Sequence, residues 1–392
     1  MYRLLEGIID RKGIIMKKIT KLVALAAIST MILPVLAGCG SKAPTQEAPI
    51  KVAVAAPQTG DYAEYGTGFK NAVNLMAEEW NAKGGVLGRK IEVVVYDDKN
   101  NGEEAATIAE KIASDKSISA VIGHFASGVA MAATPKYQET GIVNISPSAS
   151  HADFTKEGNF IFRNNTVISI ESKAAVEIAL NTLGKKKIGV LSVKTDWGTN
   201  TAGIVKKLIA ELGGELVDHQ EIVDGTVDFS PNISQLNSAG AEVVIVAAMY
   251  NTLAPLATQY KAVNKDIQFV GFSNAYSQQL IELAKENAEG IHFPAQFFSG
   301  STKPEVSKFV EAYKAKYGSN PSSLTAQAYD SMGIILTAIQ NAKSTDRAKI
   351  RDEVEKIQYS GVTGATKFNE NRDSVRPFTV VKIEGGKFVE VK

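Results

Sequence analysis

Residues 50–98, "IKVAVAAPQTGDYAEYGTGFKNAVNLMAEEWNAKGGVLGRKIEVVVYDD", have the pattern of a strand, a helix and a second strand. Residues 50–57 and 89–98 are rich in apolar side chains, and residues 65–85 form an amphipathic pattern that ends at a Gly-Gly pair. Near-continuous apolar strands separated by helices are typical of a parallel sheet covered on both faces. The stretch therefore predicts an α/β fold.

The same alternation continues along the chain in two sets of segments. The first set adds predicted strands at 118–124 and 142–149 and helices at 102–116 and 128–141. The second set comprises predicted strands at 187–198, 215–223, 242–250 and 267–274 and helices at 201–214, 229–240 and 252–264. Two such sets predict two α/β lobes. The length from the first strand onward, about 340 residues, also favours two units over one.

The C-terminal third returns to helices, predicted at 303–318 and 324–343. It ends in a predicted hairpin at 378–391, in which Gly385 and Gly386 supply the turn. Two helices and a hairpin have too little core of their own, so we expect this tail to pack on the earlier lobes.

The N-terminal region has the layout of a secretory signal. A basic segment at 16–21 precedes an apolar run at 22–36, which is too short to cross a bilayer comfortably. The exit, Leu36-Ala37-Gly38-Cys39, resembles the lipobox of bacterial lipoproteins and contains the single cysteine of the 392 residues. We predict a signal peptide at 16–38, acylation of Cys39 and a linker at 39–49.

Two further expectations follow from this leader. Residues 1–15 do not fit a signal peptide and are interpreted as an upstream extension from a mis-assigned start codon. The mature protein is expected outside the cytoplasm, lipid-anchored to the outer face of the cytoplasmic membrane or in the periplasm. The alternative is that Cys39 is a buried thiol of a cytosolic protein.

Composition and motifs exclude several function classes. The 43 lysines and arginines nearly balance the 42 aspartates and glutamates, and no basic patch stands out, which argues against a nucleic-acid partner. The four histidines are scattered without ligand spacing, so we expect no metal. Because neither a nucleophile elbow nor a nucleotide-binding loop is present, we expect no cofactor and no catalysis. Asp97 and Asp98 are interpreted as a water-exposed strand end.

Residues 50–98 closely resemble the start of the Leu/Ile/Val-binding-protein family, which comprises extracytoplasmic solute receptors of ABC importers. Shorter matches follow in order: "AVIGHFASG" (120–128), "GIVNISPSAS" (141–150), "FIFRN" (160–164), "KTDWG" (194–198), "VVIVAAMY" (243–250), "VGFS" (270–273) and "EGIHFPAQF" (289–297). The resemblance implies a bilobal type I periplasmic-binding fold, with two doubly wound parallel-sheet lobes joined by a three-stranded hinge. A ligand would lie in the cleft and hold the lobes shut.

The resemblance also implies where the chain passes between the lobes. The crossings are expected near 163–166, near 293–294 and near Phe368. Lobe 1 would then comprise residues 50–164 and 294–367, and lobe 2 residues 165–293 and 368–392.

The predicted strand at 118–124 and the helix after it place Ser127 at the carboxyl edge of a sheet, where doubly wound proteins bind ligands. Free N–H groups at a helix start favour an anion, and by resemblance Ser127 contacts the ligand's α-carboxylate. The loop after the next predicted strand contains Ser148, Ala149 and Ser150. Its backbone carbonyls and the Ser150 hydroxyl are expected to be free to bind a ligand. The alternative is that Ser127 and Ser150 merely cap helices.

Four aromatic residues fall on family positions that line the cleft, where each would bury a large area. They are Tyr65, Trp197, Tyr250 and Phe297. The alternative for each is an ordinary place in the core.

Ser273 departs from the family pattern, because amino-acid-binding members often carry an acidic residue there for the ligand's ammonium. A buried ammonium without a carboxylate partner is costly. Either another acid reaches the site, or the ligand has no ammonium.

We interpret the chain as a monomeric, lipid-anchored solute receptor that delivers an amino acid of the branched-chain type to an ABC permease. The alternatives are an aromatic or aliphatic carboxylate or a small amide as ligand, or a sensor of ligand instead of an importer. An enzyme has the weakest support.

Overall fold

Five parallel strands form the first sheet of the computed structural model, which describes residues 47–391, in the order β2-β1-β3-β4-β5. The strands are β1 (Ile50–Ala55), β2 (Ile91–Tyr96), β3 (Ile118–Gly123), β4 (Val143–Ser146) and β5 (Ile161–Arg163). Helix α2 (Ala63–Ala82) connects β1 to β2. The strand–helix–strand prediction for residues 50–98 is therefore confirmed.

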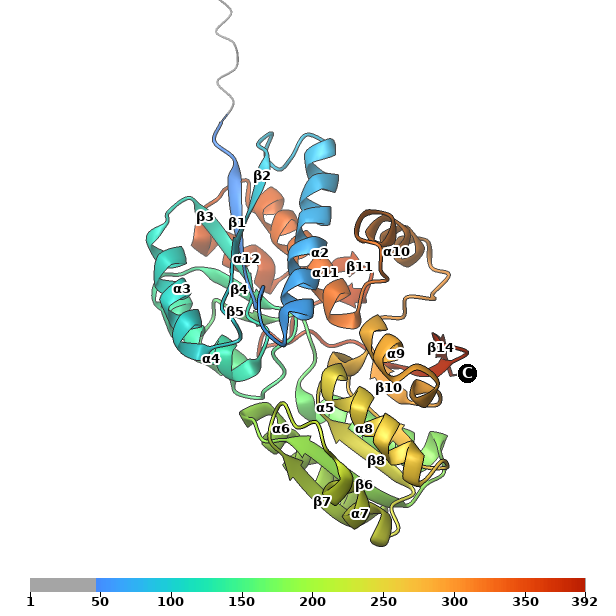
Figure 1. Cartoon of the computed structure of the whole chain (residues 1–392). Helices are drawn as coiled ribbons and strands as arrows, with labels where there is room; N and C mark the ends of the chain where they lie inside the picture. The colour runs from blue at the N-terminus through green and yellow to red at the C-terminus, as the bar shows by residue number, and fades with distance from the viewer. Residues whose placement is uncertain (1–46, 392) are drawn as a thin grey trace, which may run out of the picture. The chain divides into compact units, whose positions relative to one another are not determined.

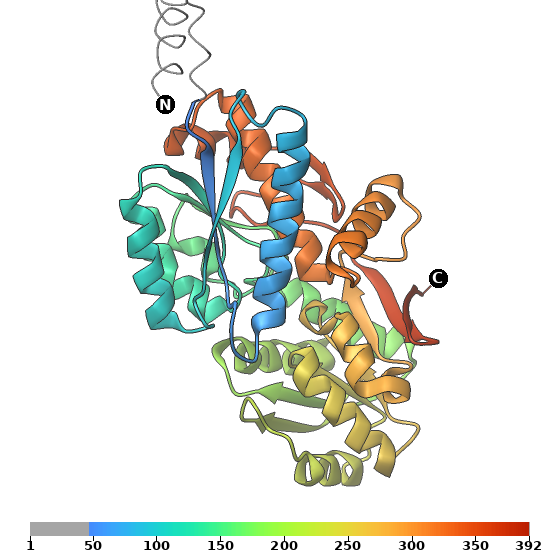
Figure 2. The same cartoon turned by 45° about the horizontal axis from the view of Figure 1, so that its top comes forward.

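Helices cover both faces of this sheet because successive side chains of a strand point to opposite faces. Val52 and Val54 of β1 belong to the core shared with α2 and α11 (Ser323–Ala342). Ala53 and Ala55 belong to the core under α3 (Gly102–Ser114) and α4 (Ser127–Glu139). Figures 1 and 2 show α2 and α11 side by side over one face, with α3 and α4 on the other.

Seven strands form the second sheet in the order β14-β13-β10-β9-β8-β6-β7. They are β6 (Lys187–Val193), β7 (Glu215–Ile222), β8 (Val243–Ala247), β9 (Gln268–Val270), β10 (His292–Ala295), β13 (Thr379–Glu384) and β14 (Lys387–Glu390). Strands β6 to β10 run parallel, whereas the C-terminal hairpin joins β10 antiparallel. Two α/β lobes are therefore present, and the predicted hairpin extends the second sheet.

The second sheet is also covered on both faces. Ile188 and Val190 of β6 belong to a core with α5 (Ile168–Glu177) and α6 (Asp196–Glu211), whereas Leu191 and Val193 face the other core. The helices on that other side include α7 (Ser230–Ser238), α8 (Tyr250–Val263) and α9 (Gln278–Ala284). Short helical segments extend these elements: η2 (Ile178–Thr182), η3 (Ser273–Ala275) and η4 (Lys285–Ala288).

Some elements were not predicted from the sequence. Helix α10 (Pro304–Tyr317) and helix α11 lie where helices were expected, but α12 (Arg347–Glu355) was missed because only Ile350 and Val354 are buried on it. Helix α5, helix α9, the short η1 (Phe154–Glu157) and the hairpin of β11 (Tyr359–Gly361) and β12 (Gly364–Thr366) were missed too.

The chain leaves the first sheet after β5, leaves the second after β10, and returns to the second before β13. These passages correspond to a three-stranded hinge, and β10 itself includes Pro294. The exact division into residues 50–164 with 294–367 and residues 165–293 with 368–392 stays a prediction.

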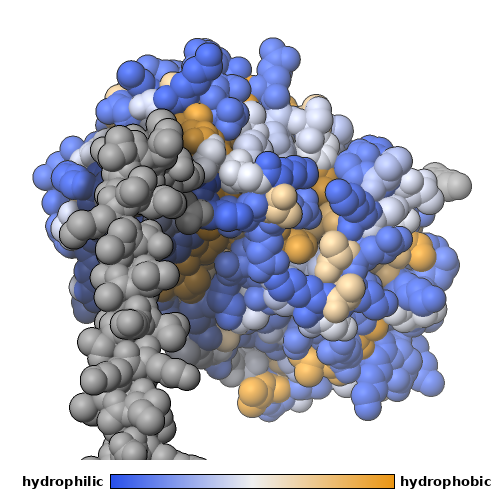
Figure 3. Space-filling model, turned by 90° about the horizontal axis from the view of Figure 1, so that it is seen from above, coloured by the Kyte–Doolittle hydropathy of each residue, from blue (hydrophilic) through white to orange (hydrophobic). Residues whose placement is uncertain are grey.

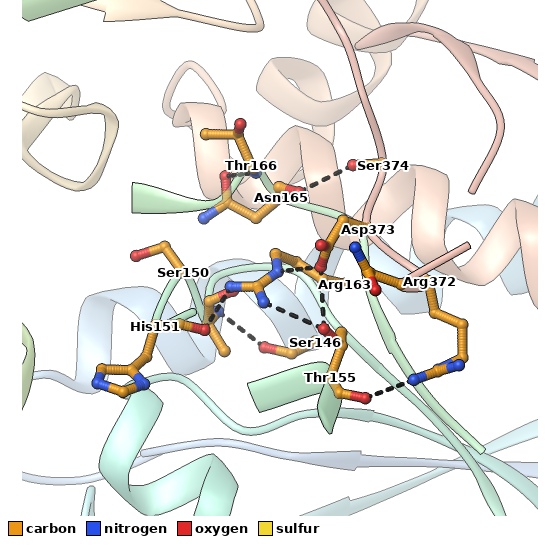
Figure 4. A network of polar contacts seen from close by, with 12 residues as sticks. Ser146, Ser150, His151, Thr155, Arg163, Asn165, Thr166, Arg372, Asp373 and Ser374 are labelled. Atoms are coloured by element: carbon orange, nitrogen blue, oxygen red, sulfur yellow. Dashed lines mark hydrogen bonds and ion pairs between the residues drawn. The ribbon is translucent and has the colours of Figure 1, made fainter. Parts of the chain in front are cut away.

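A buried ion pair ties the first and third passages together. Arg163 is fully buried, and its Nε donates to Asp373 Oδ1 at 2.7 Å. Its Nη1 donates to the carbonyls of Ala149 and His151 at 3.3 and 2.8 Å, and the backbone N–H of Ser374 donates to the Arg163 carbonyl at 3.0 Å. Figure 4 shows the Arg163 guanidinium between His151 and Thr155 of one segment and Asp373 of another, far along the chain. Arg163 therefore fixes the segment of Ala149 to His151 relative to the hinge.

Several sequence predictions lie outside the described residues. They are the upstream extension at 1–15, the signal peptide at 16–38, Cys39 and most of the linker. Residues from Ala48 onward form one compact unit. Between residues 47 and 391, no helix has the length and apolar character needed to cross a membrane. The face shown in Figure 3 is mostly hydrophilic, with apolar residues singly or in small groups.

The Arg163–Asp373 pair gives a stability prediction. Replacing Asp373 by Asn leaves a buried guanidinium without its counter-charge, so we expect the free energy of unfolding to fall by about 3–5 kcal/mol. Burial already lowers the pKa of Arg163, and Asp373 is the group that opposes this shift. Denaturant melts of both proteins measure the difference.

The matched control is Asp153→Asn. Asp153 pairs with Lys156 at 2.6 Å, but the two side chains are 57% and 72% exposed. We expect the denaturant midpoint of this variant to be nearly that of the wild type, because exposed ion pairs contribute little to stability. Equal effects of the two variants would show that the buried pair does not hold the hinge.

Candidate functional site

A cavity of about 320 Å³ lies between the two sheets. Most of its lining comes from the loops that follow the five strands of the first sheet and β6, β7, β8 and β9 of the second, and Leu324 of α11 also lines it. These loops share one property: each follows the carboxyl end of a parallel strand, which is where α/β sheets bind ligands. The size suits a small molecule.

The first wall is the start of helix α4. Ser127, Gly128 and Val129 line the cavity at the first turn of that helix. The first N–H groups of a helix have no intrahelical partner, and the helix dipole adds a favourable potential for an anion, worth about 0.3–1 kcal/mol. The residue before the helix, Ala126, has no side chain that could occupy these N–H groups. The wall therefore offers donors to a negative group.

Neither Ser127 nor Ser150 caps a helix. Ser127 Oγ accepts hydrogen bonds from the backbone N–H groups of Ser150 and His151 at 3.2 and 3.3 Å. Ser150 Oγ accepts one from Trp197 Nε1 at 2.9 Å. Within residues 47–391 both hydroxyls accept in these bonds, so each keeps its own proton for a ligand oxygen. The capping alternative is wrong for both residues.

Ser148 also lines the cavity, but its proton is already used. Its hydroxyl donates to the carbonyl of Phe125 at 2.7 Å, and its own carbonyl accepts from Asn165 Nδ2 at 2.8 Å. Ser148 thus joins the two strand-end loops on which Ser127 and Ser150 stand.

Beneath this wall, His124 is fully buried and positions the loop. Its Nδ1 lies 2.6 Å from Asp98 Oδ2 and its Nε2 lies 3.1 Å from Tyr137 Oη. Its carbonyl accepts from the Ser146 and Ser148 hydroxyls. The interpretation of Asp98 as water-exposed is therefore wrong, because its side chain is buried against this histidine.

Of the nine residues predicted to bind the ligand, five line the cavity and four do not. The five are Ser127, Ser148, Ser150, Trp197 and Ser273. Ala149 is fully buried beside them, and its carbonyl accepts from Arg163. The proposed contact of each residue with a ligand stays a prediction.

The other three residues do not line the cavity and pack on other aromatic rings. Tyr65 stacks on Phe125 with ring centroids 4.2 Å apart and donates from its hydroxyl to the Asn274 carbonyl at 2.7 Å. Tyr250 packs on Tyr65 at 5.6 Å, and Phe297 packs on Phe309 at 6.0 Å. Tyr65 therefore supports two residues that do line the cavity, Phe125 and Asn274.

Glu171 lines the cavity and was not predicted from the sequence. It is 2% exposed, and its Oε1 accepts from the backbone N–H of Ser273 at 2.6 Å. Burial raises the pKa of Glu171 to about 7, and the hydrogen bonds from Ser273 oppose that shift. The sequence did contain a sign of this burial. Glu171 lies three residues after Ile168 and four before Ala175, so the three side chains share the buried face of α5.

Apolar and aromatic lining residues were missed as well. Phe125, Met249 and Leu324 give the cavity an apolar part. At its rim the Tyr62 hydroxyl donates to Asp224 of the second lobe. Phe125, Met249 and Asp224 lie in loops, and Leu324 lies in the first turn of α11, so no periodic pattern of the sequence indicates that they line a cavity.

A family model described as periplasmic binding protein matches residues 49–387, nearly the whole described chain. The chain belongs to the Leu/Ile/Val-binding-protein-like family of periplasmic binding proteins. A Pseudomonas aeruginosa relative, named leucine-, isoleucine-, valine-, threonine- and alanine-binding protein, is 28% identical over 83% of this chain and 87% of its own length. Members of this family are substrate-binding proteins, and the family resemblance drawn from the sequence is confirmed.

Solved structures of periplasmic binding proteins share the fold. The substrate-binding protein LivJ from Streptococcus pneumoniae, solved in complex with isoleucine, has a TM-score of 0.81 at 27% identity and covers 88% of this chain and 100% of that chain. A solute-binding protein from R. palustris, solved in complex with benzoate, also has a TM-score of 0.81, at 23% identity, covering 88% and 96%. The second likeness shows the fold alone.

The raised pKa of Glu171 predicts how the Glu171→Gln variant of this binding protein responds to pH. The pKa of the Glu171 carboxyl is 4.5 in the unfolded chain and about 7 in the folded protein. The wild type therefore loses stability as pH rises between these two values. The variant has no such loss. We expect the free energy of unfolding of E171Q, relative to wild type, to increase by about 2 to 3 kcal/mol between pH 5 and pH 8.

Denaturant melts without added ligand at both pH values test this. The control is Glu177→Gln on the same helix, where the side chain is 45% exposed and faces Lys173 at 3.8 Å. Parallel pH profiles of E171Q and wild type would show that Glu171 is not held in a desolvated site.

Proposed function

We propose that this chain is a lipid-anchored extracytoplasmic receptor that captures an amino acid of the branched-chain type and delivers it to an ABC permease. The ligand lies in the cavity between the two sheets, and the lobes close on it by a hinge motion. The receptor makes and breaks no bond. It acts as a monomer.

Binding of a carboxylate group is the part of this proposal with the strongest support. Helix α4 begins at the cavity with free N–H groups, and the hydroxyl protons of Ser127 and Ser150 are available beside it. Hydrogen bonds to an ionised group contribute about 1.5–3 kcal/mol each. This donor cluster is the single observation that carries the proposal. The isoleucine complex of the similar LivJ protein supports an amino acid as the ligand.

The apolar part of the cavity supports a ligand with a hydrocarbon side chain. Phe125, Met249 and Leu324 provide contact surface there. Burying apolar surface contributes roughly 25 cal/mol per Å². A leucine-sized side chain therefore adds to the binding energy without a specific polar contact.

A carboxylate without an amine is the second candidate. Its support is Ser273, which stands where amino-acid-binding members often carry an acidic residue. An aromatic or aliphatic acid would use the same donors at α4 and would leave Ser273 without a charged partner.

A thermal-shift screen of amino acids, aromatic acids, aliphatic acids and small amides tests the ligand class. We expect a branched-chain amino acid to raise the melting temperature. It should also change the fluorescence of Trp197, whose ring nitrogen donates to Ser150 across the cavity. A Trp80→Phe variant removes the other tryptophan's signal. If no compound of these classes raises the melting temperature, the proposal is wrong.

The carboxylate wall is tested by Ser127→Ala. We expect the dissociation constant for the amino acid found in the screen to rise about 10- to 100-fold, because one hydrogen bond to an ionised group is lost. Isothermal titration calorimetry measures the change. The control is Ser114→Ala, an exposed serine at the end of α3. An unchanged dissociation constant in S127A would exclude this residue from the carboxylate site.

The lipid anchor is tested by Cys39→Ser. Multiple acyl chains on one cysteine hold a protein on the membrane at roughly 0.8 kcal/mol per buried methylene. Expressed from its full-length gene in a bacterial host, wild type should fractionate with membranes and C39S should be soluble. Membrane association of both proteins would contradict the anchor.

A further inference from the structure

The charged side chains that line the cavity are all acidic. Among residues 47–391 the lining contains Glu171, Asp196 and Asp224 but neither lysine nor arginine. Asp196 and Asp224 are exposed to water, whereas Glu171 is 2% exposed. The cavity is therefore suited to a ligand that carries a positive group, and only Glu171 would meet that group out of water.

The Glu171 carboxylate lies beside the position that Ser273 occupies. The backbone N–H of Ser273 donates to its Oε1 at 2.6 Å. Thus helix α5 delivers a carboxylate, from a distant part of the sequence, to the place where other family members carry an acid on the β9 loop. The serine at position 273 does not remove the acid from the site; a different segment supplies it.

We propose that Glu171 binds the ammonium group of the ligand and makes this receptor select amino acids over carboxylates that lack an amine. This inference rests on the proposed function and specifies its ligand class. Ser127 belongs to the first lobe and Glu171 to the second, and both line the same cavity. A zwitterion therefore joins the lobes through its two opposite charges.

The energetics of the buried acid agree with this role. A buried carboxylate is costly unless it is paired, and within residues 47–391 the groups that stabilise the charge of Glu171 are the amide and hydroxyl of Ser273. An ammonium placed against the carboxylate compensates the desolvation and makes a charge-assisted hydrogen bond. A ligand without an amine leaves the acid unpaired, so it binds less well.

The test compares each amino acid with the same acid lacking its amino group, such as leucine with 4-methylpentanoate. Valine, isoleucine, alanine and phenylalanine are paired in the same way. Calorimetry on the wild-type protein should show the amino acid binding about 10- to 100-fold more tightly than its partner. In Glu171→Gln this preference should fall to threefold or less, because the amino acid loses affinity and the amine-free acid keeps or gains it.

Glu177→Gln is the matched control, since it makes the same chemical change on α5 away from the cavity. It should retain the wild-type preference. Circular dichroism and the melting temperature establish that the variants are folded. Should E171Q not fold, Glu171→Met, which fills a similar volume without charge, replaces it with the same expectation.

Three results would overturn the inference while leaving the receptor function intact. These are equal binding of the paired ligands by the wild type, an unchanged preference in folded E171Q, and loss of both ligands in E171Q. The third counts because a role confined to the ammonium predicts that the amine-free acid still binds. If the wild type binds neither member of any pair, the proposed function itself fails.

Discussion

The buried Arg163 guanidinium is the constraint on which the arrangement of the site depends. A charge out of water must be paired, and Arg163 satisfies this need with Asp373 and with the carbonyls of Ala149 and His151. These partners come from the return passage of the hinge and from the β4 loop. One guanidinium thus couples the connection between the lobes to the loop on which Ser150 stands.

The two lobes contribute different chemistry to the cavity. The first lobe provides dipoles: the start of α4 and serine hydroxyls oriented by backbone N–H groups and by Trp197. The second lobe provides a net charge through Glu171, held by Ser273. Because a ligand with both an acid and an amine needs both walls, recognition and closure are the same event in the receptor we propose.

Much of the fold could be predicted because the inner strands β1, β3, β6 and β8 are almost wholly buried and stand out as apolar runs. Five residues predicted to bind the ligand line the cavity: strand ends indicated Ser127, Ser148 and Ser150, and the family resemblance indicated Trp197 and Ser273. Glu171 was missed because α5 was not predicted. Asp98 was misread because its burial depends on His124, a contact between two loops that no local pattern reveals.

The acidic residues in the described lining of the cavity differ in their exposure, and this has a consequence for the surroundings in which the protein works. Asp196 and Asp224 are exposed, so salt screens their charges over about 8–10 Å in physiological media, whereas a buried charge such as that of Glu171 is screened much less. Ionic strength therefore acts mainly on the two exposed acids. In the receptor we propose, the contact made by Glu171 would be retained in dilute and in saline surroundings alike.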